Sequence, residues 1–516
     1  MSHTRLFAQF SRLMAAALEP SEKAGRDLGT TRRTFLKQVT TAAAVAAGAP
    51  SLFAARPGQN VDVGIVGAGL AGLVCADTLR KKGIRATLYE ASVRTGGRCF
   101  SLRNVFPGQV AERGGEFIDN LGKVLLGYTQ QFGLTLEDCE KVPGEVFYFF
   151  NGRLVAETAI VGEFRSLVSA MRKDLTRLSQ GPTADSFNPF DAALDNISLS
   201  QYLDSRGAGP LAKAAIIAAY EAEYGLVAGQ QSCLNFLLFI HADRRSKFTP
   251  FGVFSDERWH IVEGNDAIAT GIAGLLPGQI EYGRKLVRVA KTPAGRIELV
   301  FETGATRRHD AVVVGIPFSV LRLVDLDSSL GLPAWKVAAI QQLGYGTNAK
   351  TMIRFDGRPW RSAGSSGTCY SDLQNVQTAW ETNHSKATPN RGILTDYASG
   401  NRGAALNPAQ LQTQVSQFLT DLEHIYPGAI ALATRDMSGN FVAHLEHWPS
   451  NPLTLGSYTC YTPGQFTSIA GNEGKPVDNL YFAGEHANSF YDWQGFMEGA
   501  AISGIDAAGQ VLRDFK

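Results

Sequence analysis

The sequence has few cysteines and no surplus of either charge. Six cysteines are scattered along 516 residues, without a CxxC pair and without the spacing to histidine that metal sites use. Lysine and arginine number 49 against 48 aspartates and glutamates, so no bulk field attracts nucleic acid or an anionic membrane. No apolar run is long enough to cross a bilayer. We therefore expect no metal site, no nucleic-acid partner and no stable membrane insertion, and nothing in the sequence pairs the cysteines.

Residues 1–55 are expected to form a leader outside the fold. The stretch TRRTFLK at 31–37 resembles a twin-arginine export signal, and an alanine-rich apolar stretch follows at 39–49. The alternative is a basic patch ahead of an ordinary alanine-rich helix. Pro50 opposes cleavage directly before it, which leaves a cut near position 54 or 55 open. The pattern predicts export by the twin-arginine route to the periplasm or the outside of the cell.

Glycine is abundant, at 54 residues, and the most informative glycines lie in residues 61–90. An apolar run at 61–66 indicates a buried strand, and GAGLAG follows at once. A helical pattern and a second apolar run come next, and that run ends on Glu90. This order of strand, glycine turn, helix, strand and acid is typical of a dinucleotide-binding βαβ unit. The expected cofactor-binding residues are Gly67, Gly69, Leu70, Ala71, Gly72 and Glu90.

Each part of this unit has a physical role in holding an ADP-ribose group. Gly67 permits the tight turn, Gly69 lets backbone N–H groups approach a pyrophosphate, and Gly72 lets the helix pack close to the strand. The helix N-terminus presents a partial positive charge to the phosphates. Glu90 can accept hydrogen bonds from both ribose hydroxyls. Glycine-rich helix starts also occur for packing alone, but the complete context favours a dinucleotide site, either NAD or FAD.

The next motif bears on that choice. Residues 94–98, RTGGR, follow Glu90 closely, and Gly97 and Arg98 give a second close backbone approach with a cation beside the same pyrophosphate. The alternative is a Gly-Gly turn with a solvated arginine. Glu90 followed at this spacing by GGR resembles the flavin amine oxidases, the superfamily of monoamine oxidases, polyamine oxidases and L-amino acid oxidases. The resemblance implies that the cofactor is FAD.

Later segments resemble the same family in the same order. Residues 110–119 carry a second glycine pair that the resemblance places near the flavin ring, and the backbone of Val287 matches a position that touches adenine. AGEH at 483–486 resembles the second FAD motif, and the glycine-rich stretch 494–504 begins a last helix aimed at the flavin. The further cofactor-binding residues that the resemblance implies are Gly114, Gly115, Glu116, Val287, Gly484, Glu485, Gly499 and Ala500.

The resemblance implies an α/β fold, with a Rossmann-type FAD-binding domain of the discontinuous, GR2-like kind and an α+β substrate-binding domain. The expected FAD domain comprises 60–140, 255–310 and 466–516, and the expected substrate domain comprises 141–254 and 311–465. Local patterns further predict a helix over 120–133, a hairpin turning at Asn151-Gly152, a helix-rich region over 163–228 and a strand at Cys460.

Four residues are candidates for the catalytic side of the flavin. LGYGTNAK resembles the family segment whose lysine, here Lys350, holds a water at flavin N5; a surface lysine at a strand edge is the alternative. The stretch 447–458 resembles a family pattern that here includes Trp448 and Tyr458. Covalent family members carry cysteine just before that tyrosine, and Ser457 stands here, which implies non-covalent FAD. Phe496 stands where a second tyrosine would complete an aromatic sandwich around the amine.

The chemistry that the resemblance implies is oxidative deamination of a primary or secondary amine, a monoamine or a polyamine. Hydride leaves the carbon that bears the amine, water hydrolyses the imine, and the electrons pass to O2, giving H2O2, or to an electron-transfer protein. L-amino acid oxidases commonly use an arginine near position 116 for the substrate carboxylate, and Glu116 and Asp119 stand here instead. The alternatives are an L-amino acid oxidase, a related FAD-dependent desaturase or dehydrogenase, and, least favoured, a flavoprotein without turnover. A homodimer is possible, and the sequence does not decide the oligomeric state.

Asp119 has two interpretations that the sequence does not separate. It stands where some polyamine oxidases place an acid at the mouth of the substrate tunnel, which would attract a distal ammonium. Aspartate also suits the cap of the helix expected to begin near Leu121.

Overall fold

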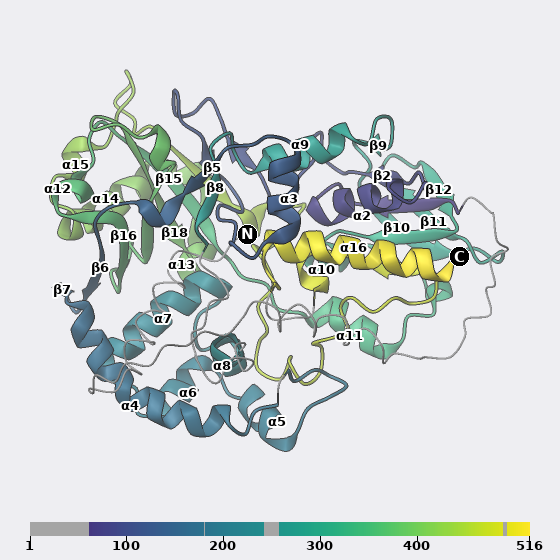
Figure 1. Ribbon diagram of the computed structural model, residues 1–516, viewed down its shortest axis with the longest axis horizontal. Coiled ribbons are helices and arrows are strands. Elements are labelled where there is room, and N and C mark those ends of the chain that lie inside the picture. The colour runs from purple at the N-terminus through teal and green to yellow at the C-terminus, as the bar shows by residue number, and fades with distance from the viewer. Residues whose placement is uncertain (1–60, 180, 242–256, 489–492, 516) are drawn as a thin grey trace, which may run out of the picture.

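The computed structural model describes residues 61–179, 181–241, 257–488 and 493–515 (Figure 1). The leader expected over 1–55 lies outside the described residues, so export stays a prediction. In Figure 1 the sheet with the glycine turn lies on the right with helices α2 and α16, and a larger sheet lies at the upper left above a group of helices.

A five-stranded parallel sheet carries the βαβ unit, in the order β20-β13-β1-β2-β9. Its strands are β1 (Val63–Val66), β2 (Thr87–Tyr89), β9 (Ile280–Glu281), β13 (Ala311–Val314) and β20 (Leu480–Phe482). Every residue of β1 and β13 is buried, as expected of central parallel strands covered on both faces. Helix α2 (Leu70–Arg80) crosses from β1 to β2, and α16 (Met497–Asp514) lies alongside it (Figure 1). Gly504 allows this approach, because a Cβ there would lie 2.3 Å from the carbonyl oxygen of Ala71.

The sequence-based boundary at residue 310 is wrong. It assigns β13 to the substrate domain, whereas β13 lies between β1 and β20 in the parallel sheet. A neighbouring four-stranded sheet, in the order β12-β11-β10-β14, also takes a strand from beyond that boundary. Its strands are β10 (Leu286–Lys291), β11 (Ile297–Phe301), β12 (Thr306–His309) and β14 (Asp325–Leu326). The chain therefore crosses to the other sheet after β14.

Two short strand pairs and two helices add to this part of the molecule, and the helices pack against α2 and α16. These elements are β3 (Ser101–Leu102) paired with β4 (Ala111–Glu112), β5 (Leu136–Asp138) paired with β8 (Trp259–Ile261), α3 (Lys123–Gln131) and α9 (Asp266–Gly274). Helix α3 is shorter than the predicted 120–133. The helix begins only at Lys123, because a turn precedes it in which the Leu121 N–H donates to Asp119 Oδ1 at 2.7 Å. Gly133, with φ +64°, follows shortly after its end.

A seven-stranded sheet forms the second unit, in the order β19-β15-β18-β17-β16-β6-β7. Its strands are β6 (Glu145–Phe150), β7 (Arg153–Val155), β15 (Ala349–Phe355), β16 (Ser365–Ser371), β17 (Thr378–Thr382), β18 (Gly392–Ala398) and β19 (Ala443–His447). The hairpin predicted at Asn151-Gly152 is confirmed, and both residues have positive φ. Cys460 lies outside the described strands, contrary to expectation, although its N–H donates to the Gly344 carbonyl.

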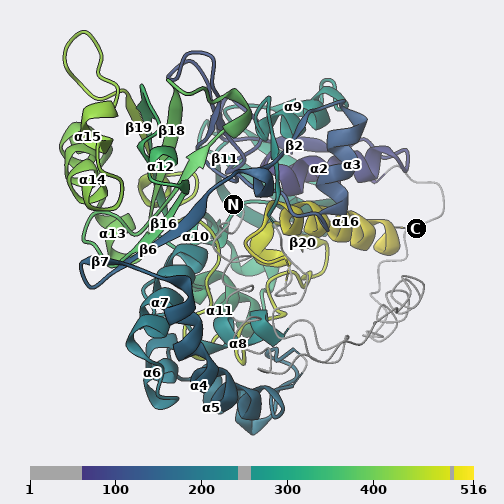
Figure 2. The ribbon, with the colours of Figure 1, turned by 60° about the vertical axis from the view of Figure 1, so that its left-hand side comes forward.

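Helices cover both sides of this sheet (Figure 2). On the lower side of Figure 2, and confirming the helix-rich prediction, lie α4 (Glu157–Leu175), α5 (Pro189–Asp195), α6 (Leu199–Ser205), α7 (Pro210–Tyr224) and α8 (Cys233–His241). On the outer side lie α14 (Leu411–Ile425) and α15 (Ala429–Leu432), while α12 (Pro359–Ser362) contacts β16 and α13 (Gly400–Ala405) contacts β18. The connection from the parallel sheet carries α10 (Phe318–Leu321) and α11 (Ala334–Gln342).

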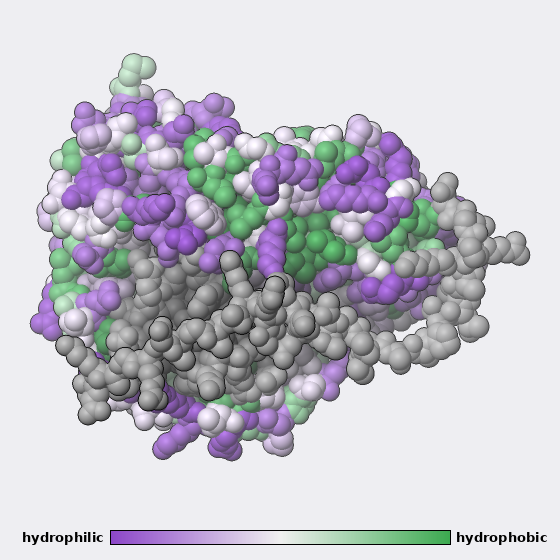
Figure 3. All heavy atoms as spheres, viewed as in Figure 1, coloured by the Kyte–Doolittle hydropathy of each residue, from purple (hydrophilic) through white to green (hydrophobic). Residues whose placement is uncertain are grey.

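Within the described residues, no helix combines the length and apolar character needed to cross a membrane. All six cysteines are buried, and no disulfide joins any of these described residues. Hydrophilic and hydrophobic areas alternate on the described part of the face in Figure 3.

Candidate active site

A cavity of about 360 Å³ begins at the turn between β1 and α2. Gly67 has φ +97°, and a Cβ there would lie 3.1 Å from the Gly315 carbonyl oxygen. Gly69 is the N-cap of α2, and a Cβ on it would meet nothing within 4 Å. No side chain of the described residues caps this helix, so its first N–H groups face the cavity as donors for an anion. Gly72 lies behind the turn, where a Cβ would come within 2.0 Å of the Gly67 carbonyl oxygen.

Glu90 directly follows β2 and lines the same cavity. Its Oε2 accepts the Ala68 N–H at 2.8 Å, and its Oε1 accepts the Ser92 N–H at 2.8 Å. These bonds fix an almost buried carboxylate beside the glycine turn. An anion held there suits neutral ribose hydroxyls and would repel a 2′-phosphate.

Arg98, which is partly buried, and Glu485, which is buried, form an ion pair on the cavity wall, with Nη1 2.8 Å from Oε1. Arg98 Nη1 also donates to the Ser457 carbonyl at 2.7 Å, and the Thr459 hydroxyl donates to Glu485 Oε2 at 2.9 Å. Burial acts to raise the pKa of Glu485, but the attraction of Arg98 outweighs it and holds that pKa below its usual value. The GGR motif, the segment around Ser457 and the AGEH motif are far apart in the sequence, and they therefore meet at this ion pair.

The second glycine pair passes close behind the far end of the cavity. A Cβ on Gly114 would lie 1.6 Å from the Arg98 carbonyl oxygen, and one on Gly115 would lie 2.6 Å from Met497 Sδ. Trp448 lines the cavity, and its Nε1 donates to the Arg113 carbonyl at 2.9 Å. The pair thus brings the chain against cavity-lining side chains, and its expected contact with the cofactor stays a prediction.

Glu116, expected at the cofactor, turns its carboxylate toward the seven-stranded sheet. Oε2 accepts from Lys350 Nζ at 2.7 Å, and Oε1 accepts from Trp380 Nε1 at 2.9 Å. Lys350 stands at the start of β15, and both Lys350 and its charged partner Glu116 are buried within the protein. Neither Lys350 nor Glu116 is among the described residues that line the cavity.

The two aromatic residues expected to enclose the amine differ in position. Phe496 is the N-cap of α16 and lines the cavity. Tyr458 packs against Trp448 instead of lining the cavity, and its hydroxyl donates to the Ala222 carbonyl at 2.8 Å. Burial raises the pKa of Tyr458 well above its usual value, so this hydroxyl stays neutral.

The remaining predicted cofactor residues divide between the wall and the layer behind it. Those lining the cavity are Gly67, Gly69, Leu70, Ala71, Glu90, Gly97, Arg98, Val287, Gly484, Glu485 and Ala500. Those behind it are Gly72, Gly114, Gly115, Glu116 and Gly499. Gly499 has a packing role, because a Cβ there would lie 1.9 Å from the Trp493 carbonyl oxygen.

Asp119 is buried and accepts the Leu121 N–H, as a turn cap does. The first N–H groups of α3 are taken by Glu498, whose carboxylate accepts from Val124 and Leu125 at 2.8 and 3.0 Å. Asp119 therefore caps the turn ahead of α3 and not the helix itself, whose N-cap is Gly122, and a charge at a tunnel mouth stays a prediction.

The family model described as flavin containing amine oxidoreductase matches residues 70–512. The chain belongs to this family. Relatives include the L-amino-acid oxidase of Naja atra, 23% identical over 87% of this chain and 87% of the relative, and polyamine oxidase 4 of Oryza sativa subsp. japonica, 28% identical over 45% of each chain. The solved structure of cyclohexylamine oxidase from Brevibacterium oxydans IH-35A is 20% identical, with a TM-score of 0.75 over 88% of this chain and 99% of that one. The predicted resemblance and the fold class are confirmed.

The residues of this amine oxidoreductase fit a flavin dinucleotide. The open N-terminus of α2 and the space in front of Gly69 suit a pyrophosphate, and Glu90 suits a ribose. At the other end Met497 and Ala500 bring the first turn of α16 to the cavity. Its N–H groups favour negative charge that develops on a reduced ring.

Sequence reasoning did not single out two cations on the cavity wall, Arg284 and Lys285. Arg284 pairs with Glu281 at 2.9 Å, and Lys285 pairs with Glu302 at 2.8 Å. The only sequence signal was their position just ahead of Val287, which is too common a pattern to identify a site. Both cations are therefore ion-paired where they line the cavity.

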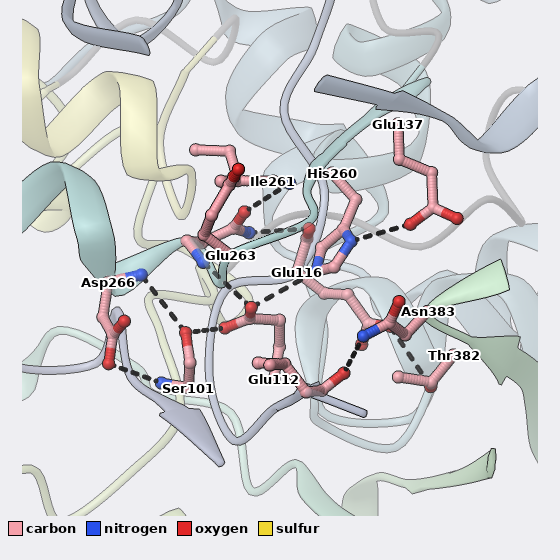
Figure 4. A network of polar contacts seen from close by, with 12 residues as sticks. Ser101, Glu112, Glu116, Glu137, His260, Ile261, Glu263, Asp266, Thr382 and Asn383 are labelled. Carbon is pink, nitrogen blue, oxygen red and sulfur yellow. Dashed lines mark hydrogen bonds and ion pairs between the residues drawn. The ribbon is translucent and has the colours of Figure 1, made fainter. Parts of the chain in front are cut away.

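A buried polar network is centred on His260 (Figure 4). His260 stands between Glu112 and Glu137, at 3.2 and 3.1 Å. Burial alone would lower the pKa of His260, but the two carboxylates outweigh it and raise the pKa to about 10. Glu137, Cys139 and His384 also approach one another within 4.8 Å, as metal ligands could. Both Glu137 oxygens already accept, from His260 and from the Ser385 N–H, so the expectation of no metal site stays a prediction.

Proposed function

We propose that this protein is an FAD-dependent amine oxidase that deaminates a primary or secondary amine. The observation that carries the proposal is one cavity whose lining includes both the glycine turn of the βαβ unit and the rings of Trp448 and Phe496. This lining supports a dinucleotide and an aromatic wall for the amine in one continuous space. When bound, the flavin supplies a two-electron acceptor for the hydride that leaves the amine-bearing carbon.

The residues of the chain supply orientation, exclusion of water and electrostatics. Trp448 is fixed by its bond to the Arg113 carbonyl, and Phe496 is almost fully buried, so both form a rigid and dry wall. Tyr458 supports Trp448 from behind. The imine that forms is hydrolysed by water, and O2 accepts the two electrons with two protons to give H2O2.

Glu116 supports an amine over an amino acid as the substrate. An anion occupies the position near which an amino acid oxidase would need a cation for the substrate carboxylate, and a second buried acid, Asp119, follows it. The support is therefore the lack of an arginine at this position, since neither acid is among the described residues that line the cavity. The second candidate function is an L-amino acid oxidase, which is favoured by the match to the Naja atra enzyme along most of both chains.

A substrate panel tests the proposed function. The purified protein is mixed without oxygen with monoamines, diamines of equal length and L-amino acids, and loss of the oxidised flavin absorbance is followed. We expect amines to reduce the flavin, and expect H2O2 in proportion to amine once air is admitted. Reduction by amino acids alone would instead establish the second candidate, and no reduction by either class would leave a flavoprotein without this activity.

We also propose that FAD is bound without a covalent link. Ser457 precedes Tyr458, and Cys460 is not among the described residues that line the cavity. Cys99 does line it, but burial raises the pKa of this thiol well above its usual value, which makes it a poor nucleophile. We expect acid to release all of the FAD from the polypeptide. Yellow colour that stays with the denatured chain would contradict this, and its loss in Cys99→Ser would locate the link.

A further inference from the structure

Lys350 uses its full hydrogen-bonding capacity on the chain itself. An ammonium has three N–H donors. Nζ lies 2.7 Å from Glu116 Oε2, 2.8 Å from the Gly114 carbonyl oxygen and 3.2 Å from the Glu112 carbonyl oxygen. Both members of the ion pair are about 4% exposed in their side chains. The lysine is thus anchored to the segment that contains the second glycine pair.

Glu116 joins this segment to the seven-stranded sheet. Its Oε1 accepts from Trp380 Nε1 at 2.9 Å and from the Thr382 hydroxyl at 3.3 Å, and both of these residues belong to β17. Nζ of Lys350 also lies 5.5 Å from the centroid of the Trp380 ring. The two charges are therefore enclosed by aromatic and backbone groups, where electrostatic interactions are weakly screened.

The pair lies one layer behind the cofactor cavity. Gly114, which accepts from Lys350, is so close to Trp448 that a Cβ would lie 3.3 Å from its Cζ2. Trp448 lines the cavity. A net charge at this pair would act on the flavin through a thin layer of low dielectric, whereas equal and opposite charges would largely cancel.

We propose that Glu116 is a positioning residue that holds Lys350 against the glycine segment and cancels its charge at the flavin. The proposal rests on the proposed flavin site. If Lys350 acted at the flavin alone, Glu116 would have no part in setting the redox equilibrium of the cofactor. A purely structural Glu116 would also leave that equilibrium unchanged.

The test is the midpoint potential of the bound FAD, measured at pH 6 by reduction against a reference dye with no amine present. In Glu116→Gln the carboxylate charge is lost while the ammonium remains, and a lone cation favours the reduced flavin. We expect a rise of about tenfold in the reduction equilibrium, which is about 30 mV for a two-electron couple. In the double variant Glu116→Gln/Lys350→Met both charges are gone, and we expect the natural potential to return.

Glu116→Asp is the matched control, because it keeps the charge and changes only the reach; its potential is expected to stay near that of the natural protein. An unchanged potential in Glu116→Gln, or a rise that persists in the double variant, would overturn the proposal. If Glu116→Gln does not hold FAD, Lys350→Met at pH 9 decides, since an ionised Glu116 left alone must lower the potential. These measurements use no amine, so they can be interpreted even if no amine in the substrate panel reduces the flavin. If the proposed flavin site is wrong, the purified protein should contain no FAD.

Discussion

Alanine at position 114 is expected to leave the protein without bound FAD and strongly destabilised. A Cβ on Gly114 would lie 1.6 Å from the Arg98 carbonyl oxygen and 3.3 Å from Trp448 Cζ2. The indole cannot withdraw easily, because it is hydrogen-bonded to the Arg113 carbonyl. The cost is expected at the upper end of overpacking, about 3 kcal/mol or more of the free energy of unfolding. Flavin absorbance per protein and urea unfolding measure the two effects.

Gly127→Ala is the matched control for this substitution. Gly127 is exposed on α3, and a Cβ there meets nothing within 4 Å. Alanine is better than glycine inside a helix by roughly 0.5–1 kcal/mol, so this variant should be slightly more stable and should hold FAD normally. Full FAD content and unchanged stability in Gly114→Ala would mean that the glycine segment does not pack against Arg98 and Trp448 as described.

The sequence was sufficient for the nucleotide half of the site. The strand, turn, helix and acid of residues 61–90 are consecutive, so their roles follow from local geometry, and Gly69 and Glu90 line the cavity. The same holds for Arg98, which the GGR motif placed at the cofactor and which lines the cavity. Local periodicity also sufficed for the hairpin at Asn151-Gly152.

The sequence was not sufficient for contacts between distant segments. Glu116 was expected at the cofactor because its neighbours are glycines of a family motif, but its partner Lys350 is 234 residues away. A motif records residue types along the chain and carries no information about the direction in which a side chain leaves it. The boundary at residue 310 failed for a related reason: the apolar run of β13 fits either sheet, and only its pairing with β1 and β20 decides.

Removing the cation of Arg98 is expected to have a second large effect. Arg98→Met leaves the buried carboxylate of Glu485 without its ion-pair partner, with a side-chain exposure of only 3%. Breaking a buried pair by deleting one partner typically costs about 3–5 kcal/mol of the free energy of unfolding. The double variant Arg98→Met/Glu485→Gln removes the stranded charge and should recover much of that loss. Urea unfolding with and without added FAD separates stability from cofactor binding.

The pH dependence of Arg98→Met gives an independent check on the cause. In the natural protein the pKa of Glu485 is held below its usual value, so this acid contributes stability above the unfolded-state pKa and loses it as the pH falls through the folded-state pKa. Without Arg98 the opposing effect of burial is left, and the pKa of Glu485 should rise above its unfolded value. The penalty is then full at neutral pH and disappears as the carboxyl takes up a proton.

The difference in unfolding free energy between the two proteins should therefore shrink from pH 7.5 to pH 4.5. A difference that stays constant over this range would show that Arg98 stabilises the fold through its packing and its bond to the Ser457 carbonyl, not through the charge of Glu485.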